Sequence, residues 1–337
     1  MTNEWTIPSV PLSKKEKLIV GVSGGSDSLG LLFILLDRLP EAQGRLVVAH
    51  VNYGLRGGAS NRDEEKVRRI CRDLNLPFKK LRVRGFKSRV LREKRSAQDW
   101  ARHIRYSFFQ KLVREQKAWG AAVAHHLEDQ AETVLDRLLR GAGPRGLSGL
   151  RPVQSVSFDP KFPPLKIWRP LLGFSKGRIQ SFLTSKNIQW REDKSNQENK
   201  YRRNQIRNKI LPFLSRWNPK FTEVLARVGE ITAAEDIFME GQLAPLEKKM
   251  NGRWGKGDYA CQASVFAKAP IALQRRWIRR IADRLNPQAR GLSFERIEEV
   301  IRLWKGLEPG PKDLGFGLTG GRTLGRAFLR WKGRKTP

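Results

Sequence analysis

Short apolar runs alternate with longer segments of helical period along residues 17–140. Strand-like runs rich in Val, Ile, Leu and Ala fall at 17–22, 45–51, 78–83 and 120–126. Segments with helical spacing of apolar residues fall at 64–76, 97–116 and 127–140, and in the second of them the predicted buried stripe is Trp100, Ile104, Phe108 and Leu112. Strands that alternate with helices predict an α/β fold with a doubly wound, mostly parallel sheet. Ligands bind such sheets beyond the carboxyl ends of the strands, so the loop within 17–35 and the segment His125–Glu132 are expected to face one another.

The turn after the first strand, "SGGSDS" at 23–28, interrupts two apolar patterns of different period. Residues 17–22 read as a strand, and the apolar positions after Ser28 recur at helical spacing. Gly24 and Gly25 permit a tight turn, and the N-terminus of the helix favours an anion. The alternative is that Ser26, Asp27 or Ser28 simply caps the helix without binding a ligand. The loop matches neither a G-x-x-x-x-G-K-[ST] P-loop nor a G-x-G-x-x-G dinucleotide motif.

The rest of the chain predicts a domain of a different kind. Residues 141–164 are rich in Gly and Pro, which predicts an irregular connection, and residues 220–250 have a helical pattern. We therefore expect a catalytic domain at 1–214, a helical linker at 215–250 and a smaller basic C-terminal domain at 251–337. The last part has 19 Lys and Arg against 7 Asp and Glu, a net charge of +12. Its four tryptophans can stack on bases or, as we expect for most of them, pack in the core: Trp254, Trp277, Trp304 and Trp331.

Charge and cysteine content narrow the class of protein. The 337 residues carry 66 basic and 33 acidic side chains, and the net charge of +33 predicts a polyanionic partner, most often a nucleic acid. No run approaches the ~18 apolar residues of a membrane span, and the first residues lack the pattern of a signal peptide, so we expect a cytoplasmic protein without a membrane partner. Cys71 and Cys261 stand alone in the sequence, which excludes a disulfide framework and a cysteine-based metal site within one chain.

Acidic and imidazole groups recur at helical spacing after the fourth predicted strand. His125, Asp129 and Glu132 lie at i, i+4 and i+7 and are predicted to share one helix face. Two carboxylates can hold Mg²⁺ or an ammonium group, and a histidine can move a proton or meet a phosphate. The alternative is a solvated face whose acids complement the helix dipole. A metal site made of His125 and His126 is not expected, because adjacent helical residues do not face each other.

Basic candidates for phosphate contacts fall in three places. Arg56 follows Asn52 at the end of a predicted strand, and Arg105 lies in the 97–116 helix. Each can contact phosphate or be an ordinary surface arginine. The segment 202–209, "RRNQIRNK", suits a sugar–phosphate backbone, with a solvated basic helix as the alternative. Its members of interest are Arg202, Arg203, Asn204 and Arg207.

Together these segments resemble one family. "SGGSDS" is similar to the S-G-G-x-D-S loop of the N-type ATP pyrophosphatases. That match alone leaves tRNA thiolases, amide-forming nucleotide synthetases and argininosuccinate synthetase open. The segments "HVNYGLRGGASNRDEE", "WARHIRYSFF", "AHHLEDQAETVLDRLLRGAGPRGLSGL", "RPLL" and "REDKSNQENKYRRNQIRNKILPFL" resemble, in order, the blocks of the bacterial tRNA(Ile)-lysidine synthetases. The resemblance covers about 17–214.

The resemblance implies a reaction and its substrates. The family enzymes use ATP, with Mg²⁺, to adenylate the C2 oxygen of the wobble cytidine of tRNA(Ile) with a CAU anticodon, and free L-lysine then displaces AMP. It also implies that an ATP-binding loop, in which Asp27 is a Mg²⁺ partner, is formed by Ser23, Gly24, Gly25, Ser26, Asp27 and Ser28. Contacts with the α-phosphate and with lysine are implied for Arg105, His125, Asp129 and Glu132, and Asp129 is also a candidate Mg²⁺ ligand. Contacts with the tRNA are implied for Arg56, Arg202, Arg203, Asn204 and Arg207. A homodimer is a further hypothesis.

The chain departs from the family pattern in small ways. The family often has histidine where Tyr53 stands beside Asn52, and two aspartates where Glu128 and Asp129 stand. Tyr53 therefore puts any histidine role at that position in doubt. Among the alternatives, a tRNA thiolase normally needs paired cysteines, an amide-forming synthetase leaves the charge of +33 unexplained, and a non-catalytic RNA-binding protein leaves the 23–28 loop without a purpose.

Overall fold

The computed structural model describes residues 7, 12–13, 16–39, 41–55, 57–86, 88, 90, 96–190, 202–286 and 292–332. The chain separates into two compact units, Met1–Ala233 and Ala234–Pro337, and the boundary falls inside helix α11 (Phe221–Gly241). The three-part division at 214 and 250 stays a proposal. Among the described residues no helix is both long and apolar enough to cross a membrane.

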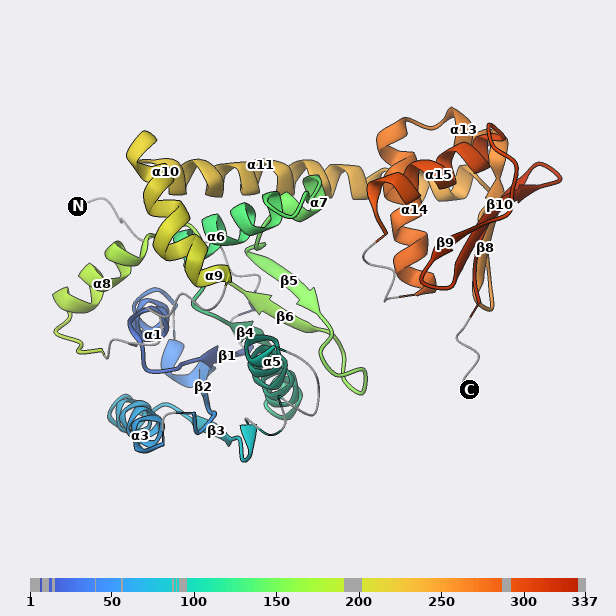
Figure 1. Cartoon of the computed structure of the whole chain (residues 1–337). Helices are drawn as coiled ribbons and strands as arrows, with labels where there is room; N and C mark the ends of the chain where they lie inside the picture. The colour runs from blue at the N-terminus through green and yellow to red at the C-terminus, as the bar shows by residue number, and fades with distance from the viewer. Residues whose placement is uncertain are drawn as a thin grey trace. The chain divides into compact units, whose positions relative to one another are not determined.

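A six-stranded sheet forms the centre of the first unit, with the strand order β3-β2-β1-β4-β6-β5 (Figure 1). All neighbouring strands pair in parallel except the edge strand β5, which pairs antiparallel with β6. The predicted α/β fold with a mostly parallel sheet is confirmed. The strands are β1 (Lys17–Gly21), β2 (Leu46–Asn52), β3 (Phe78–Arg82), β4 (Ala118–Ala122), β5 (Val153–Val156) and β6 (Leu165–Trp168).

The order of the strands places a ligand crevice. From β1 the chain builds β2 and β3 on one side, then returns to place β4 and β6 on the other. The strand order therefore reverses between β1 and β4, and a doubly wound sheet opens a crevice at the carboxyl ends of such a strand pair. The 23–28 loop follows β1, and residues 123–126 follow β4.

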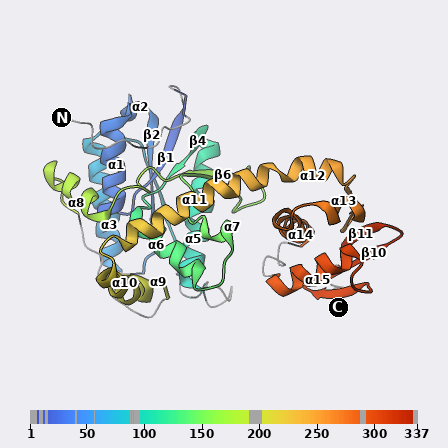
Figure 2. The ribbon, with the colours of Figure 1, turned by 90° about the horizontal axis from the view of Figure 1, so that it is seen from above.

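Helices cover both faces of this sheet. Side chains alternate along β1, so Leu18 and Val20 pack with α1, α3 and α8, whereas Ile19 packs with α5 on the opposite face. Figure 2 shows α1, α3 and α8 grouped on one side of β1, β2 and β4. The helices of this part are α1 (Ser26–Arg38), α2 (Ala42–Arg45), α3 (Gly58–Asp73), α5 (Ala97–Glu115) and α8 (Lys176–Ser185).

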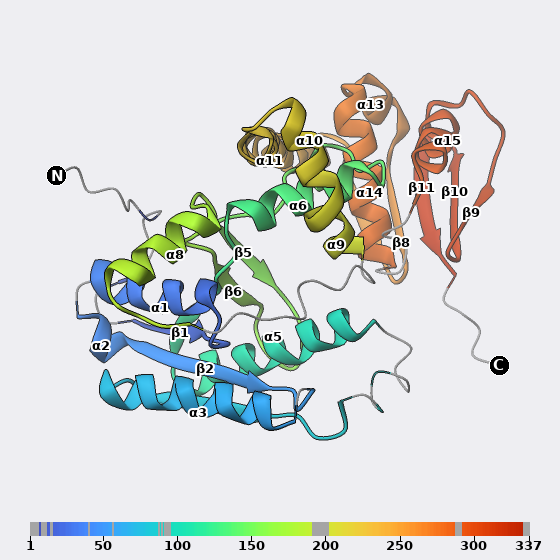
Figure 3. The same ribbon diagram turned by 60° about the vertical axis from the view of Figure 1, so that its left-hand side comes forward.

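A third packed group lies beside the sheet. Ala131 and Val134 of α6 pack with Ile206, Leu211 and Leu225, so α6 lies against the segments that follow residue 201. Figure 3 shows α6 beside α9 and α10. The elements of this group are α6 (Leu127–Leu138), α7 (Pro144–Leu147), α9 (Arg202–Gln205), the π-helical turn η2 (Ile206–Ile210), α10 (Leu211–Trp217) and the first part of α11.

Three predictions about these elements were wrong in part. Within α5, Leu112 is buried as predicted, but Tyr106 and Phe109 are the other buried apolar side chains, and Trp100, Ile104 and Phe108 are half-buried. The contact with the sheet determines which face of α5 is buried, and the apolar spacing alone did not show which face this would be. Helix α3 begins at Gly58, six residues before the predicted start at 64. Residues 141–164 are not simply irregular, because they contain α7 and β5.

The second unit contains a five-stranded antiparallel sheet in the order β7-β8-β11-β10-β9. Trp277 and Trp304 are fully buried in its core, as expected, whereas Trp254 is partly buried and Trp331 is exposed. The predicted helices at 220–250 are present as α11 and α12 (Leu243–Lys249). The other elements are β7 (Arg253–Gly255), β8 (Asp258–Gln262), α13 (Ala263–Lys268), α14 (Ile271–Leu285), α15 (Phe294–Lys305), β9 (Lys312–Gly315), β10 (Leu318–Thr323) and β11 (Arg326–Trp331).

Candidate active site

The 23–28 loop joins β1 to α1 and is held by one hydroxyl. Ser28 Oγ accepts hydrogen bonds from the backbone N–H groups of Ser23 (3.1 Å) and Gly24 (3.2 Å) and donates to the carbonyl oxygen of Gly25 (3.1 Å). Gly24 adopts φ +99°, which a residue with a Cβ rarely does. The N-cap of α1 is Gly25, so the simple capping alternative for Ser26, Asp27 or Ser28 was wrong. The N-terminus of α1 is therefore available to attract an anion.

A cavity of about 240 Å³ lies at the carboxyl ends of β1, β2 and β4, where the strand order reverses. The 23–28 loop forms part of its wall, and His125 and Arg105 form other parts. The prediction that the segments after β1 and β4 face one another is thus confirmed. The residues of the 23–28 loop that line the cavity are Ser23, Gly25, Asp27 and Ser28.

The wall formed by α5 carries unused hydrogen-bonding capacity. Nε of Arg105 and the hydroxyl of Tyr106 are buried and have no hydrogen-bond partner among the described residues. Both residues line the cavity. Buried polar groups without a partner are rare, and a guanidinium beside a hydroxyl suits an anionic ligand. By contrast Tyr53 has a partner, since its hydroxyl donates to the carbonyl oxygen of Ala101 (2.9 Å).

The start of α6 agrees with the predicted segment 127–140 and lies two residues after His125. The helix begins at Leu127, and His126 is its N-cap with an extended backbone (φ −125°, ψ −175°). His125 therefore precedes the helix, and the prediction that it shares a helix face with Asp129 and Glu132 was wrong. His125 lines the cavity instead, while Asp129 and Glu132 lie buried at i and i+3 on α6.

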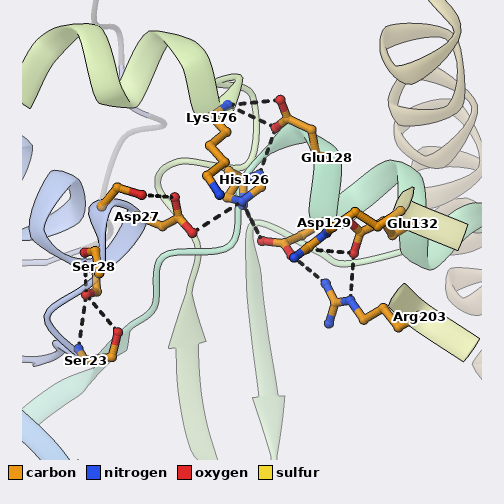
Figure 4. A network of polar contacts seen from close by, with 12 residues as sticks. Ser23, Asp27, Ser28, His126, Glu128, Asp129, Glu132, Lys176 and Arg203 are labelled. Atoms are coloured by element: carbon orange, nitrogen blue, oxygen red, sulfur yellow. Dashed lines mark hydrogen bonds and ion pairs between the residues drawn. The ribbon is translucent and has the colours of Figure 1, made fainter. Parts of the chain in front are cut away.

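His126 connects the 23–28 loop to α6, a role that the sequence reading missed (Figure 4). Its Nδ1 lies 2.8 Å from a carboxylate oxygen of Glu128, and its Nε2 lies 3.5 Å from Asp129 and 3.7 Å from Asp27. Burial alone would lower the pKa of His126, but contacts with Asp27 and Glu128 and the charge of Asp129 raise it to about 10. His126 is therefore an imidazolium at neutral pH, surrounded by three carboxylates.

Further contacts hold these carboxylates in place. Glu128 accepts hydrogen bonds from the backbone N–H of Lys176 at the start of α8 (3.0 and 3.1 Å), and Asp129 Oδ2 accepts one from the N–H of His126 (3.1 Å). Burial would raise the pKa of Asp27, but its contact with the His126 imidazolium lowers it below the usual value. Asp27 is therefore an anion beside the cavity.

Asp129 and Glu132 are paired with two arginines from the 202–209 segment. Arg203 Nη2 lies 2.5 Å from Asp129 Oδ1, and Arg203 Nε lies 2.7 Å from Glu132 Oε2. Arg207 adds contacts to Glu132 at 2.5 and 3.0 Å and to Asp129 at 3.4 Å. The alternative of a solvated acidic face is wrong for Glu132, whose side chain is only 1% exposed. We call these four residues the carboxylate–arginine cluster.

The other predicted tRNA contacts have different surroundings. Arg202 lies on the surface and pairs with Asp136 of α6 (2.8 Å), and Asn204 is half-buried. Arg56 lies outside the described residues. The 202–209 segment thus docks on α6 through its arginines, and it is not a freely solvated basic helix. Whether any of these residues contacts RNA stays a prediction.

Arg169 is a second residue of the candidate site that the sequence did not single out. It directly follows β6, is fully buried, and donates from Nε to His125 Nδ1 at 3.1 Å. Burial and the nearby guanidinium groups of Arg169 and Arg105 hold the pKa of His125 well below its usual value. The "RPLL" segment, which begins with Arg169, was the sequence signal for this residue. Its contact with His125 could not be predicted, because the two residues are 44 positions apart.

The comparisons with known proteins agree with this geometry. Residues 3–214 match the family described as the PP-loop domain. The chain is 34% identical over 290 residues to the tRNA(Ile)-lysidine synthase of Geobacter sulfurreducens, which covers 86% of this chain and 59% of that protein. It is 34% identical to the enzyme of the same name from Solibacter usitatus (85% and 61%) and 32% identical to that of Bacillus cereus (88% and 62%). The chain thus spans about three fifths of the length of these relatives.

A solved structure supports the fold independently. The U34-tRNA thiolase NcsA from Methanococcus maripaludis, solved with its [4Fe-4S] cluster, superposes with a TM-score of 0.53 at 18% identity, over 66% of this chain and 74% of that one. At this identity the likeness concerns the fold alone. The loop after β1, the cavity at the reversal of strand order and the match over residues 3–214 agree with one another. This chain belongs to the PP-loop domain family.

Proposed function

We propose that the chain is a tRNA(Ile)-lysidine synthetase, a ligase that uses ATP to join lysine to the wobble cytidine of tRNA(Ile) with a CAU anticodon. Membership of the PP-loop family implies the use of ATP, and the three relatives named above are tRNA(Ile)-lysidine synthases. The observation that carries the proposal is the connection between two sites. His126 links Asp27, which lines the cavity, to Asp129 in the carboxylate–arginine cluster.

The cavity suits the first half of the reaction. The C2 oxygen of cytidine attacks the α-phosphorus of ATP, the bond to the bridging oxygen breaks, and pyrophosphate leaves. Negative charge develops on the phosphorus oxygens, and Arg105 and His125 line the cavity that would hold them. The N-terminus of α1 favours the remaining phosphates. The unpartnered Nε of Arg105 supports this assignment.

Mg²⁺ fits this site only together with the phosphates of ATP. Among the described residues no group of three or more His, Cys, Asp and Glu side chains is arranged to hold a metal ion. Mg²⁺, however, commonly takes one or two carboxylates plus substrate phosphates. Asp27 fits that role because it lines the cavity, whereas Asp129 becomes a second ligand only if Arg203 and Arg207 move away. Bound there, the ion would neutralise charge on the phosphates.

The carboxylate–arginine cluster suits the second half of the reaction. Asp129 and Glu132 attract cations, as their pairing with Arg203 and Arg207 demonstrates. In our proposal the lysine ammonium replaces part of this pairing. One carboxylate accepts a proton from the ε-amine, the amine attacks C2, and the bond from C2 to the oxygen that carries AMP breaks. AMP and lysidine are the products.

The tRNA contacts rest on charge. The chain carries a net charge of +33, of which +12 lies in residues 251–337. Sustained positive charge supplies the salt-dependent part of RNA affinity. In the proposal Arg202, Arg203, Asn204 and Arg207 contact the tRNA backbone, together with Arg56. The homodimer stays a prediction that light scattering of the purified chain would test.

The rival enzyme, a tRNA thiolase, is disfavoured by the thiols. Cys71 and Cys261 are both buried and free. Burial raises the pKa of each thiol to about 12, so neither is a thiolate at neutral pH. Two such thiols provide neither a cluster site nor a sulfur carrier.

The decisive experiment follows the two half-reactions separately. When unmodified tRNA(Ile) is present, the full chain should release pyrophosphate from ATP. With ATP labelled at the α-phosphate, the label should accumulate in adenylated tRNA until lysine is added. Lysine should then release AMP and enter the tRNA. Pyrophosphate release that ignores tRNA, or adenylated tRNA that is inert toward lysine, would contradict the proposal. Methionine tRNA is the matched control for recognition.

A further inference from the structure

Arg169 is a buried cation without a carboxylate partner in the described part of the chain. Its side chain is fully buried. Nη1 donates to the carbonyl oxygen of Arg151 (2.7 Å), Nη2 to Oε1 of Gln154 (3.4 Å) and Nε to His125 Nδ1 (3.1 Å). A buried charge is costly unless it is compensated, so a guanidinium held in this way indicates a role beyond packing.

The contact with His125 determines where the imidazole carries its proton. A guanidinium has only donors, so Nδ1 of His125 must accept with its lone pair. The proton of the neutral ring is then on Nε2. Protonation of Nδ1 would break the hydrogen bond and place an imidazolium beside the Arg169 guanidinium.

The other guanidinium groups around His125 act in the same direction. Burial lowers the pKa of His125, and guanidinium groups from three elements lower it further; they belong to Arg169 after β6, Arg102 and Arg105 of α5, and Arg203 of α9. The remaining titratable side chains of the shared cavity are Asp27, Tyr53 and Tyr106.

We infer that Arg169 is a positioning residue that keeps His125 neutral with its proton on Nε2. His125 then enters the proposed adenylation as a hydrogen-bond donor to the phosphate and not as a general base. This inference rests on the proposed function for its catalytic consequence, but the state of the imidazole is a property of the protein alone. A neutral donor offers an N–H to developing charge and exchanges no proton with it.

Nuclear magnetic resonance of ¹⁵N-histidine-labelled full-length protein tests the tautomer directly. The chain has four histidines, and subtraction of the His125→Asn spectrum assigns His125. We expect the neutral Nε2–H form of His125 at neutral pH. His50 is an internal control in the same spectrum, because its Nδ1 lies 2.8 Å from the carbonyl oxygen of Val22 and must carry the proton. His126 should appear as an imidazolium.

Two variants separate positioning from packing. Arg169→Met removes every donor but fills similar space, and Arg169→Lys keeps a cationic donor. In Arg169→Met we expect His125 to lose its single tautomer and to titrate nearer the ordinary value of about 6.5, whereas Arg169→Lys should retain the Nε2–H form. His50 should be unchanged in both variants. Thermal unfolding and circular dichroism would verify that they fold.

The pH profile of tRNA-dependent pyrophosphate release links the tautomer to catalysis. The wild type should lack an inflection from His125 near neutrality, and Arg169→Met should gain one. An Nδ1–H tautomer in the wild type would overturn the inference, even if Arg169→Met failed to fold. So would a His125 signal that is identical in wild type and Arg169→Met. If pyrophosphate release is absent while the wild-type tautomer is as expected, the proposed function fails and the assignment of Arg169 stands.

Discussion

Glu132 offers the sharpest test of the carboxylate–arginine cluster, through the variant Glu132→Gln. The glutamate is 1% exposed, whereas Arg203 and Arg207 are 42% and 31% exposed. Removing one partner of a fully buried ion pair costs about 3–5 kcal/mol, and an exposed pair contributes about 0–1 kcal/mol. Because both arginines can turn toward water, we expect an intermediate loss of about 2 kcal/mol in the free energy of unfolding. For a unit of this size that lowers Tm by roughly 4–8 °C.

The matched control is Asp136→Asn, one turn further along α6. Asp136 also pairs with an arginine of α9, Arg202, but its side chain is 26% exposed. For Asp136→Asn we expect the free energy of unfolding to change by less than about 0.5 kcal/mol. Differential scanning calorimetry of wild type and both variants measures the two shifts. If Glu132→Gln shifts Tm no more than Asp136→Asn, the cluster does not stabilise the fold as reasoned. Lysine-dependent AMP release should fall by about two orders of magnitude or more in Glu132→Gln alone.

Three further predictions concern single residues. Asp129→Ala should abolish lysine transfer while tRNA affinity and tRNA-dependent pyrophosphate release are largely retained. Filter binding measures the affinity, and assays of the two half-reactions measure the rest. Lysine transfer by the variant at the wild-type rate would refute the assignment of Asp129 to the site. Gly24→Ala should lower the free energy of unfolding by about 1–3 kcal/mol and weaken ATP binding, because Gly24 adopts a φ of +99°. Gly25→Ala should be tolerated, because Gly25 has a φ of −81°. Equal midpoints of urea unfolding for the two variants would contradict this prediction. Because the pKa of His126 is raised from 6.5 to about 10, its stabilisation is complete below pH 6.5 and is lost as the pH rises toward 10. The stability difference between wild type and His126→Gln should therefore shrink between pH 6 and pH 10 in urea unfolding, and a constant difference would argue against the charged pair.

Local patterns predicted the loop and the sheet well. The strand pattern changes to a helix pattern within the consecutive residues 23–28, so the turn between β1 and α1 could be predicted directly from the sequence. The start of α6 at residue 127 was also predicted correctly, but His125, which precedes that start, was nevertheless assigned to the helix face of Asp129 and Glu132. That assignment overlooked His126, and the fold puts the two histidines in opposite environments, with His125 near guanidinium groups and His126 near carboxylates.

Contacts between distant segments could not be predicted. Glu132 and Arg203 lie 71 positions apart, and His125 and Arg169 lie 44 apart. No periodicity or spacing links such pairs, since only tertiary packing brings them together. The 202–209 segment could therefore be identified as basic, but its docking on the acidic residues of α6 could not. The same limit explains the face of α5 that contacts the sheet.

The adjacent histidines have a consequence for proton exchange. His125 has a pKa well below its usual value and His126 has one of about 10, so together they carry one positive charge throughout the neutral range. The pair neither takes up nor releases a proton when the buffer changes near neutrality. The charge of this pair is thus fixed by the fold itself, and small changes of pH near neutrality leave it unchanged.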